Sequence, residues 1–175
     1  AVDYLTAATK KVVGKTEDFA ITAKGKPVVI VGGGDTGNDC VGTAIRQGCT
    51  GVTQLEMMGK PAQERLPNNP WPQWPRVLKT DYGQQEAIAV FGRDPRIYQT
   101  TVKEIRPGED GSIGSVVTVK LESKQVDGRF AMVPIEGSEE ELPCGLLLIA
   151  AGFVGCQSYV ADAFGLTRDN RGSIQ

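Results

Sequence analysis

The chain has 175 residues, of which 40% are hydrophobic and 23% are charged, and its formal net charge at pH 7 is −2. This length is enough for one domain with a substantial core, and the near-neutral charge without a Lys/Arg block argues against a nucleic-acid or anionic-membrane partner. No apolar run is long enough to span a bilayer. We therefore expect a cytoplasmic protein, and its start at Ala1 rather than Met suggests an excised piece of a longer chain.

The chain contains no histidine and four cysteines, none of which forms a C-x-x-C pair. This composition leaves no obvious zinc site, no Cys–His nucleophile and no Ser-His-Asp triad. We expect reduced thiols that pack as small apolar side chains. We assign no catalytic residue and no metal ligand.

The N-terminal part predicts a helix over residues 1–15, because its apolar side chains recur on one face. A polar linker then runs to Lys26, with a short extended piece at 19–21. The run 28–31 predicts a β-strand.

A glycine motif follows this strand directly. Gly32, Gly34 and Gly37 form the pattern G-x-G-x-x-G, and a helical pattern over 36–47 begins at once. Strand, glycines and helix in this order build an anion site, because backbone N–H groups at a helix N-terminus point at a pyrophosphate.

Each glycine of the motif has a separate expected task. Gly32 permits the tight turn, Gly34 lets the phosphates approach the backbone, and Gly37 lets the helix pack on the strand. Asp35 or Thr36 is expected to cap the helix with a side-chain oxygen.

The motif also predicts an acidic residue about 20 positions further on. Residues 51–57 predict a second parallel strand, and its Glu56 follows Gly34 by 22 residues. A carboxylate at this place accepts hydrogen bonds from the ribose hydroxyls of adenosine and repels a 2′-phosphate, so it favours NADH over NADPH. The alternative is a structural glycine turn with Glu56 as a solvated strand end.

Residues 58–76 contain five prolines interleaved with Trp71 and Trp74. Proline at this density excludes a helix or a sheet interior and predicts a loop. One interpretation is a polyproline partner motif, and the favoured one is a loop whose two indoles pack onto their own domain. Lys60 and Arg65 at its start are candidate phosphate contacts, which keeps NADPH open.

In the second half of the chain the hydrophobic pattern changes to the alternation that is typical of β-strands. After a short helix over 84–91, alternating runs over 97–105, 116–121 and 129–135 are separated by two Asp-Gly turns and predict an antiparallel three-stranded meander. The apolar run 146–151 predicts a strand that is buried on both faces and rejoins the parallel sheet.

The chain leaves this last strand at its carboxyl end, where ligands bind in open α/β sheets. Ala151, Gly152 and Phe153 are therefore expected at the edge of a nicotinamide pocket, and a plain exit into a loop is the alternative. A short helix is predicted over 159–164. The whole order predicts an α/β fold: a Rossmann-like three-layer dinucleotide-binding domain with a parallel sheet and an inserted three-stranded antiparallel β-meander.

Three stretches, 32–40, 65–76 and 150–155, resemble the glutamate synthase small (beta) subunit and the C-terminal region of the NADH-dependent fused glutamate synthases. The resemblance covers nearly the whole chain, and the proline–tryptophan segment is its most discriminating part. One version of this family carries an Arg-Arg pair suited to a 2′-phosphate. This chain carries Glu56 followed by the loop and is similar to the NADH-leaning version.

The resemblance implies a division of the chain. Residues 26–155 would be the NAD(P)H-binding domain, 1–25 a helix and linker from the junction with a flavin domain, and 156–175 the incomplete start of the return into the FAD-binding domain. FAD and [4Fe–4S] clusters would belong to the parent protein and would not be bound by this chain.

The resemblance also implies the reaction. A hydride from NADH or NADPH would pass to FAD on the neighbouring domain, and the electrons would be used with the large (alpha) subunit to make L-glutamate from L-glutamine and 2-oxoglutarate. The isolated chain would bind nucleotide without turnover. The candidate cofactor-binding residues are Gly32, Gly33, Gly34, Asp35, Thr36, Gly37, Glu56, Lys60, Arg65, Ala151, Gly152 and Phe153.

Three other interpretations stay open at this point. The domain can belong to another FAD and iron–sulfur oxidoreductase of the dihydropyrimidine-dehydrogenase type, or act as a non-catalytic nucleotide-binding module. Alternatively, the glycine motif holds the ADP half of FAD. Binding measurements with the three nucleotides separate these cases.

Overall fold

The computed structural model describes residues 1–19, 21–126, 128–170 and 172–174. The elements of the described residues follow one another as α1 (Val2–Val12), β1 (Pro27–Val31), α2 (Asp35–Arg46), β2 (Gly51–Glu56), α3 (Tyr82–Phe91), β3 (Arg96–Tyr98), β4 (Thr100–Pro107), β5 (Ile113–Val126), β6 (Arg129–Pro134), β7 (Glu140–Pro143), β8 (Leu146–Ile149) and α4 (Ser158–Ala163).

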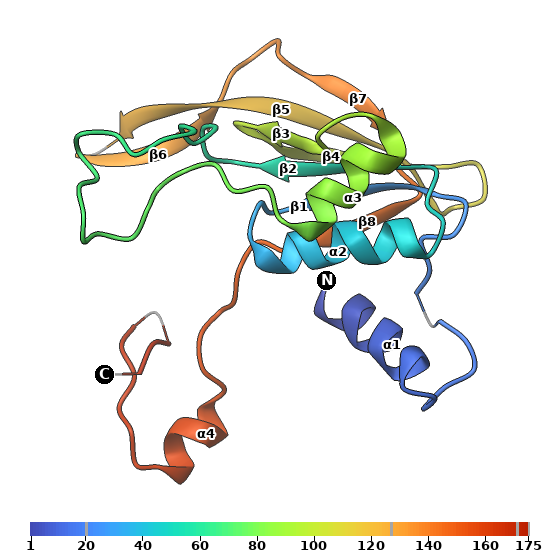
Figure 1. Ribbon diagram of the computed structural model, residues 1–175, viewed down its shortest axis with the longest axis horizontal. Helices are drawn as coiled ribbons and strands as arrows, with labels where there is room; N and C mark the ends of the chain where they lie inside the picture. Colours follow the sequence, from blue (N-terminus) through green and yellow to red (C-terminus); the bar gives the residue numbers. More distant parts are fainter. Residues whose placement is uncertain (20, 127, 171, 175) are drawn as a thin grey trace.

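These strands form two sheets (Figure 1). The first is parallel and has the order β3-β2-β1-β8, so β1 lies between β2 and β8. The second is antiparallel and is organised around the long strand β5, which pairs with β4, β6 and β7. Parallel pairing puts the carboxyl ends of β1, β2 and β8 at one edge, where crossover loops meet.

The parallel sheet is covered on both faces. On one face Val28 and Ile30 pack against the buried side chains of α2, among them Val41. On the other face Val29 packs against Val116 of the antiparallel sheet. Because successive strand residues point to opposite faces, this arrangement explains the uninterrupted apolar run of β1. The predicted three-layer α/β fold is confirmed.

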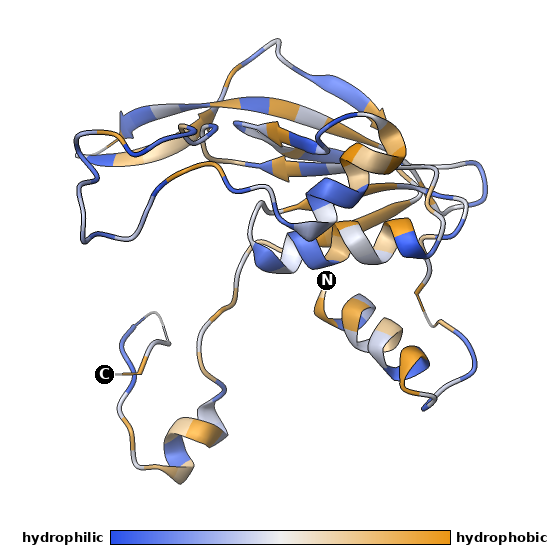
Figure 2. Ribbon diagram, viewed as in Figure 1, coloured by the Kyte–Doolittle hydropathy of each residue, from blue (hydrophilic) through white to orange (hydrophobic). Residues whose placement is uncertain are grey.

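The antiparallel sheet is buried around the middle of β5 and exposed at the end of that strand. Figure 2 shows hydrophobic and hydrophilic segments alternating along β5. Val116, Val117, Thr118 and Val119 are nevertheless all buried, so the middle of β5 is covered on both faces, whereas its last four residues are exposed. One of the two predicted Asp-Gly turns, at 127–128, includes a residue outside the described part of the chain, as does the extended piece expected at 19–21.

Three strand expectations were wrong in detail. The run 97–105 is not one strand: Gln99 adopts φ +49°, and the chain leaves the parallel sheet as β3 and enters the antiparallel one as β4. Strand β7 was not expected, because its sequence shows no apolar alternation. The apolar run 146–151 was expected to be buried on both faces, but strand β8 ends at Ile149, whose side chain is exposed.

The two tryptophan side chains of the proline-rich loop are not packed against the domain. Trp71 is 83% and Trp74 is 76% exposed, so the favoured interpretation of this loop was wrong. The loop is instead organised around the buried Asn69, whose side chain donates to the Trp74 carbonyl (3.0 Å) and accepts from the Arg76 N–H (2.8 Å). An amide can donate and accept at once, so this one buried side chain joins two backbone groups of the loop.

The two ends of the chain differ in how they meet the domain. Helix α1 packs on α2, where the Tyr4 hydroxyl donates to Gln47 Oε1 at 3.0 Å. Helix α4 follows an extended segment and lies away from both sheets in Figure 1, and Phe164 beside it is exposed. No helix in the described part of the chain has the length and apolar content to cross a membrane.

The thiols provide a test of the core. All four cysteines are free; Cys40, Cys49 and Cys144 are buried, and burial raises the pKa of the Cys40 thiol to about 11. Since the thiolate is the reactive form, a disulfide reagent at pH 8 is expected to modify Cys156 quickly and the other three only after denaturation. Cys156→Ser removes the fast phase, and rapid labelling of more than one thiol per native chain would contradict this packing.

Candidate functional site

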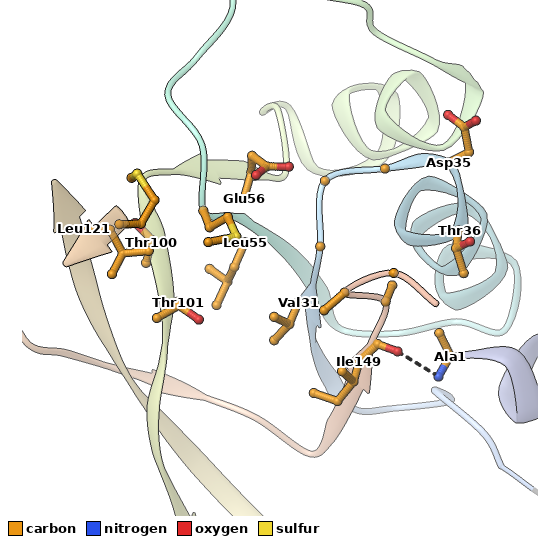
Figure 3. Close-up of a pocket in the computed structure, with 18 of the residues that line it drawn as sticks. Ala1, Val31, Asp35, Thr36, Leu55, Glu56, Thr100, Thr101, Leu121 and Ile149 are labelled. Carbon is orange, nitrogen blue, oxygen red and sulfur yellow. Dashed lines mark hydrogen bonds between the residues drawn. The ribbon is translucent and has the colours of Figure 1, made fainter. Parts of the chain in front are cut away.

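A cavity of about 710 Å³ lies at the carboxyl edge of the parallel sheet. In Figure 3, Asp35 and Thr36 of α2 stand on one side of it, and Leu55, Thr100, Thr101 and Leu121 on the other. The antiparallel sheet therefore supplies one wall of a site whose other walls are the glycine turn and the end of β8. The lining residues are Ala1, Val2, Val31, Gly32, Gly33, Gly34, Asp35, Thr36, Leu55, Glu56, Met57, Thr100, Thr101, Leu121, Met132, Pro134, Ile149, Ala150, Ala151, Gly152 and Phe153.

Close backbone contacts explain two of the glycines in the turn. Gly32 has φ +122°, and a Cβ there would lie 2.2 Å from the Ala150 carbonyl oxygen. A Cβ on Gly37 would lie 2.2 Å from the Gly32 carbonyl oxygen and 2.6 Å from Gln54 Nε2. No side chain fits at either place. Gly32 therefore lets β1 pass close to the end of β8, and Gly37 lets α2 approach the turn.

Gly34 differs from its neighbours. It lines the cavity, its φ is −79°, and a Cβ built on it meets nothing within 4 Å. Neither backbone strain nor packing therefore requires glycine at this position. Its lack of a side chain leaves open space in front of the first turn of α2.

The start of α2 carries no side-chain cap. Gly34 is the N-cap residue, no side-chain cap hydrogen bond is present, and Asp35 and Thr36 already belong to the first helical turn. The expectation that Asp35 or Thr36 caps the helix was therefore wrong. The first N–H groups of a helix carry partial positive charge, and without a capping side chain they can bind an anion.

Glu56 stands at the end of β2 beside this turn. Its Oε1 accepts from the Met58 N–H at 2.7 Å, and a Cβ on Gly33 would lie 2.0 Å from its Oε2. Figure 3 shows the carboxylate directed toward the glycine turn. One oxygen is thus fixed by the backbone, and the carboxylate lies at the rim of the cavity.

Lys60 and Arg65 do not line the cavity. Arg65 donates to the Asn69 carbonyl at 3.0 Å, inside the proline-rich loop. Lys60 lies near Asp94, whose pKa is lowered mainly by hydrogen bonds from Arg96 and to a smaller extent by Lys60. Among the described residues that line the cavity, none is Lys or Arg.

The end of β8 does lie at the site. The Ala150 N–H donates to the Val31 carbonyl at 2.7 Å, so the two strand ends are joined next to the glycine turn. Ala151, Gly152 and Phe153 follow and line the cavity, with Gly152 at φ +94° and Phe153 exposed. The structure therefore brings these three residues to the glycines, as it does Glu56.

Two sets of residues at the site escaped the sequence analysis. The cavity wall from Thr100, Leu121 and Met132 depends on how the second sheet folds over the first, which no local pattern reveals. The amide of Gln54, which contacts the glycine turn, was detectable as a polar residue within an apolar strand run.

No family model matches the chain. It is 40% identical over 177 residues to the glutamate synthase [NADH] of Schizosaccharomyces pombe, covering 99% of this chain and 8% of that protein. It is 38% identical over 174 residues to the glutamate synthase [NADPH] small chain of Bacillus subtilis, covering 97% of this chain and 35% of that one. The chain is homologous to a segment of the glutamate synthases.

The chain spans about a third of the bacterial small chain and less than a tenth of the fungal protein. Among solved structures it is similar to the thioredoxin reductase of T. acidophilum, with a TM-score of 0.55 and 21% identity over 99% of this chain and 45% of that one. At this identity the likeness concerns the fold, and it agrees with the Rossmann-like architecture described above.

Proposed function

We propose that this chain is the NAD(P)H-binding domain of a glutamate synthase. The observation that carries the proposal is the uncapped start of α2 behind Gly34, which faces a cavity large enough for part of a dinucleotide. Such an arrangement suits a pyrophosphate, because the anion approaches the N–H groups without meeting a side chain. The homology to glutamate synthases over nearly the whole chain supports the assignment.

In the whole protein, the bound nucleotide would transfer a hydride to FAD on an adjoining domain. The electrons would then serve the synthesis of L-glutamate from L-glutamine and 2-oxoglutarate, together with the large subunit and iron–sulfur clusters. This chain's own contribution is to bind and orient the nucleotide. Ala151, Gly152 and Phe153 would form the nicotinamide side of the site, and no side chain is proposed as an acid or a base.

The proposed domain division follows from the same assignment. Residues 26–155 form the nucleotide-binding domain, 1–25 belong to the junction with a flavin domain, and 156–175 begin the return into it. The position of α4 away from both sheets supports this division. A cytoplasmic location is proposed with it, since free cysteines are usual in a reducing compartment.

We propose NADH as the preferred nucleotide. Glu56 lies at the rim of the cavity beside Gly33, where the adenosine ribose would follow the pyrophosphate. A 2′-phosphate there would meet a carboxylate, and neither Lys60 nor Arg65 lines the cavity to offset this repulsion. The names of the two relatives include both nucleotides, so affinity measurements have to decide.

Glu56→Ala is expected to weaken NADH binding by about 1–3 kcal/mol, because the ribose hydroxyls lose a charged acceptor. NADPH binding should weaken less or improve, because the repulsion is removed. Titration calorimetry with both nucleotides measures the change. Glu56→Gln keeps an acceptor for the Met58 N–H and separates ribose binding from local folding.

Glu64→Ala is the matched control, since Glu64 is an exposed carboxylate that does not line the cavity. Equal NADH affinity in Glu56→Ala and the unmodified chain would contradict the proposed ribose contact. Tight uptake of FAD without binding of NADH or NADPH would overturn the proposed function itself, because the glycine turn would then hold a different dinucleotide.

A further inference from the structure

A chain of side-chain amides runs from the start of α3 to the glycine turn. The Asp81 N–H donates to Gln84 Oε1 at 2.8 Å, and Gln84 Nε2 donates to Gln54 Oε1 at 3.0 Å. Gln54 Nε2 then donates to the Gly32 carbonyl at 2.9 Å. Both glutamines are buried, with Gln54 at 0% exposure, so their side-chain amides are shielded from solvent. We refer to Asp81, Gln84, Gln54 and Gly32 as the amide relay.

The direction of the relay is fixed at its first member. A backbone N–H can only donate, so Gln84 must present its oxygen to Asp81 and its NH₂ group to Gln54. Gln54 must then present its oxygen to Gln84 and its NH₂ group to Gly32. The cap of α3, which is a capping box formed by Asp81 and Gln84, thereby decides which group faces the glycine turn.

The contact with Gly32 sets the orientation of a peptide plane. Gln54 lies on the helix-facing side of β2, where it contacts Gly37 and Gln84, whereas Leu55 lies on the opposite side and lines the cavity. A trans peptide holds its C=O and N–H on opposite sides. With the Gly32 carbonyl bound to Gln54, the Gly33 N–H points away from α3, toward the face where the cavity lies.

The two glycines alone would not keep this peptide plane in one orientation. Gly32 and Gly33 both lack the side chains that restrict φ and ψ, so their common peptide can rotate at little steric cost. The hydrogen bond from the buried Gln54 opposes that rotation, because rotating would leave the Gln54 donor buried and unpaired.

We propose that Gln54 is a positioning residue for dinucleotide binding, held in its donating orientation by Gln84. The relay keeps the Gly32–Gly33 peptide in the orientation that aims backbone N–H groups at a pyrophosphate. Gln54 and Gln84 touch no part of the nucleotide and act through the backbone. This inference rests on the proposed function and adds to it the element, α3, that determines the geometry of the turn.

Gln84→Glu tests the relay most directly. A carboxylate at this position still accepts from the Asp81 N–H, so the cap of α3 is kept, but it offers no donor to Gln54. Gln54 is then expected to turn its NH₂ group toward the carboxylate and its oxygen toward Gly32, where two acceptors repel. We expect the dissociation constant for NADH to rise about tenfold, which corresponds to about 1.4 kcal/mol.

Gln85→Glu is the matched control, because it makes the same change one position along α3 on an exposed side chain outside the relay. Its NADH affinity is expected to equal that of the unmodified chain. Gln54→Met removes the donor while keeping length and is expected to weaken NADH to a similar extent. The double variant of Gln54→Met and Gln84→Glu should lose no more than either single one, since both interrupt one relay.

Thermal denaturation on each variant ensures that affinity is compared between folded chains. NADH affinity in folded Gln84→Glu and Gln54→Met equal to that of the unmodified chain would overturn the inference. A measurement without any variant is also decisive: the side-chain amide protons of Gln54 should exchange slowly with solvent by NMR, and rapid exchange would overturn the relay.

The two proposals can fail separately. If the unmodified chain binds neither NADH nor NADPH, the proposed function fails. The backbone amide resonance of Gly33 still reports the orientation of the turn in that case, and it is expected to shift in Gln84→Glu but not in Gln85→Glu. An unshifted Gly33 resonance in Gln84→Glu would refute the relay even where nucleotide binding is intact.

Discussion

Replacing Gly34 with alanine is expected to weaken pyridine-nucleotide binding at least about tenfold while changing the free energy of unfolding by less than about 1 kcal/mol. The position has an ordinary φ of −79°, and the new methyl group would meet no protein atom within 4 Å. The fold therefore tolerates the change. The methyl group would stand in front of the first turn of α2, where the proposed pyrophosphate would approach the N–H groups.

Titration of the folded variant with NADH measures this effect, and denaturant unfolding checks its stability. Gly51→Ala is the matched control. As at Gly34, a Cβ added to Gly51 would meet no atom within 4 Å, but Gly51 lies at the end of β2 that is far from the cavity. It should bind NADH as the unmodified chain does. Undiminished affinity in Gly34→Ala would place the pyrophosphate elsewhere.

The same substitution three residues later is expected to act on stability instead. In Gly37→Ala the new Cβ would lie 2.2 Å from the Gly32 carbonyl oxygen and 2.6 Å from Gln54 Nε2. The Gly32 backbone can make room only if α2 moves away from the turn, and this movement would break the hydrogen bond from the buried Gln54 to Gly32. Overpacking and the lost hydrogen bond together are expected to cost about 3–5 kcal/mol of unfolding free energy.

Denaturant unfolding of Gly37→Ala measures this loss, with Gly34→Ala as the internal comparison. A loss of this size is a large part of the stability of a typical domain. The better helix propensity of alanine, worth at most about 1 kcal/mol, opposes the loss without cancelling it. An unchanged unfolding midpoint in Gly37→Ala would show that α2 can move at no cost, contrary to its close packing here.

Some features of the site were predictable because they depend on short stretches of chain. The apolar run of β1, the glycines after it and the helical period of α2 all lie within 27–46, and they predict one local unit. The acidic residue Glu56 was predictable because a βαβ unit has a nearly constant length. The wrong expectation that Asp35 or Thr36 caps the helix arose because Gly34 itself occupies the N-cap position.

Other features depend on contacts between distant parts of the chain. Trp71 and Trp74 were expected to be buried because indoles are costly to expose, yet the loop closes around Asn69 and leaves them in solvent. Lys60 and Arg65 were expected at a phosphate because of their position after β2. The hydrogen bond of Arg65 to the Asn69 carbonyl keeps it within that loop.

The amino-acid sequence by itself determined the strand, glycine turn and helix at the start of the parallel sheet and the carboxylate at the end of β2, because hydrophobic period and glycine spacing act over a few residues. Only the tertiary structure decided how the antiparallel sheet closes the cavity and how Gln84 of α3 reaches Gln54 and, through it, Gly32. The two hydrogen bonds join residues that are 30 and 22 positions apart. Their geometry follows from the packing of whole layers, which no local pattern in the chain encodes.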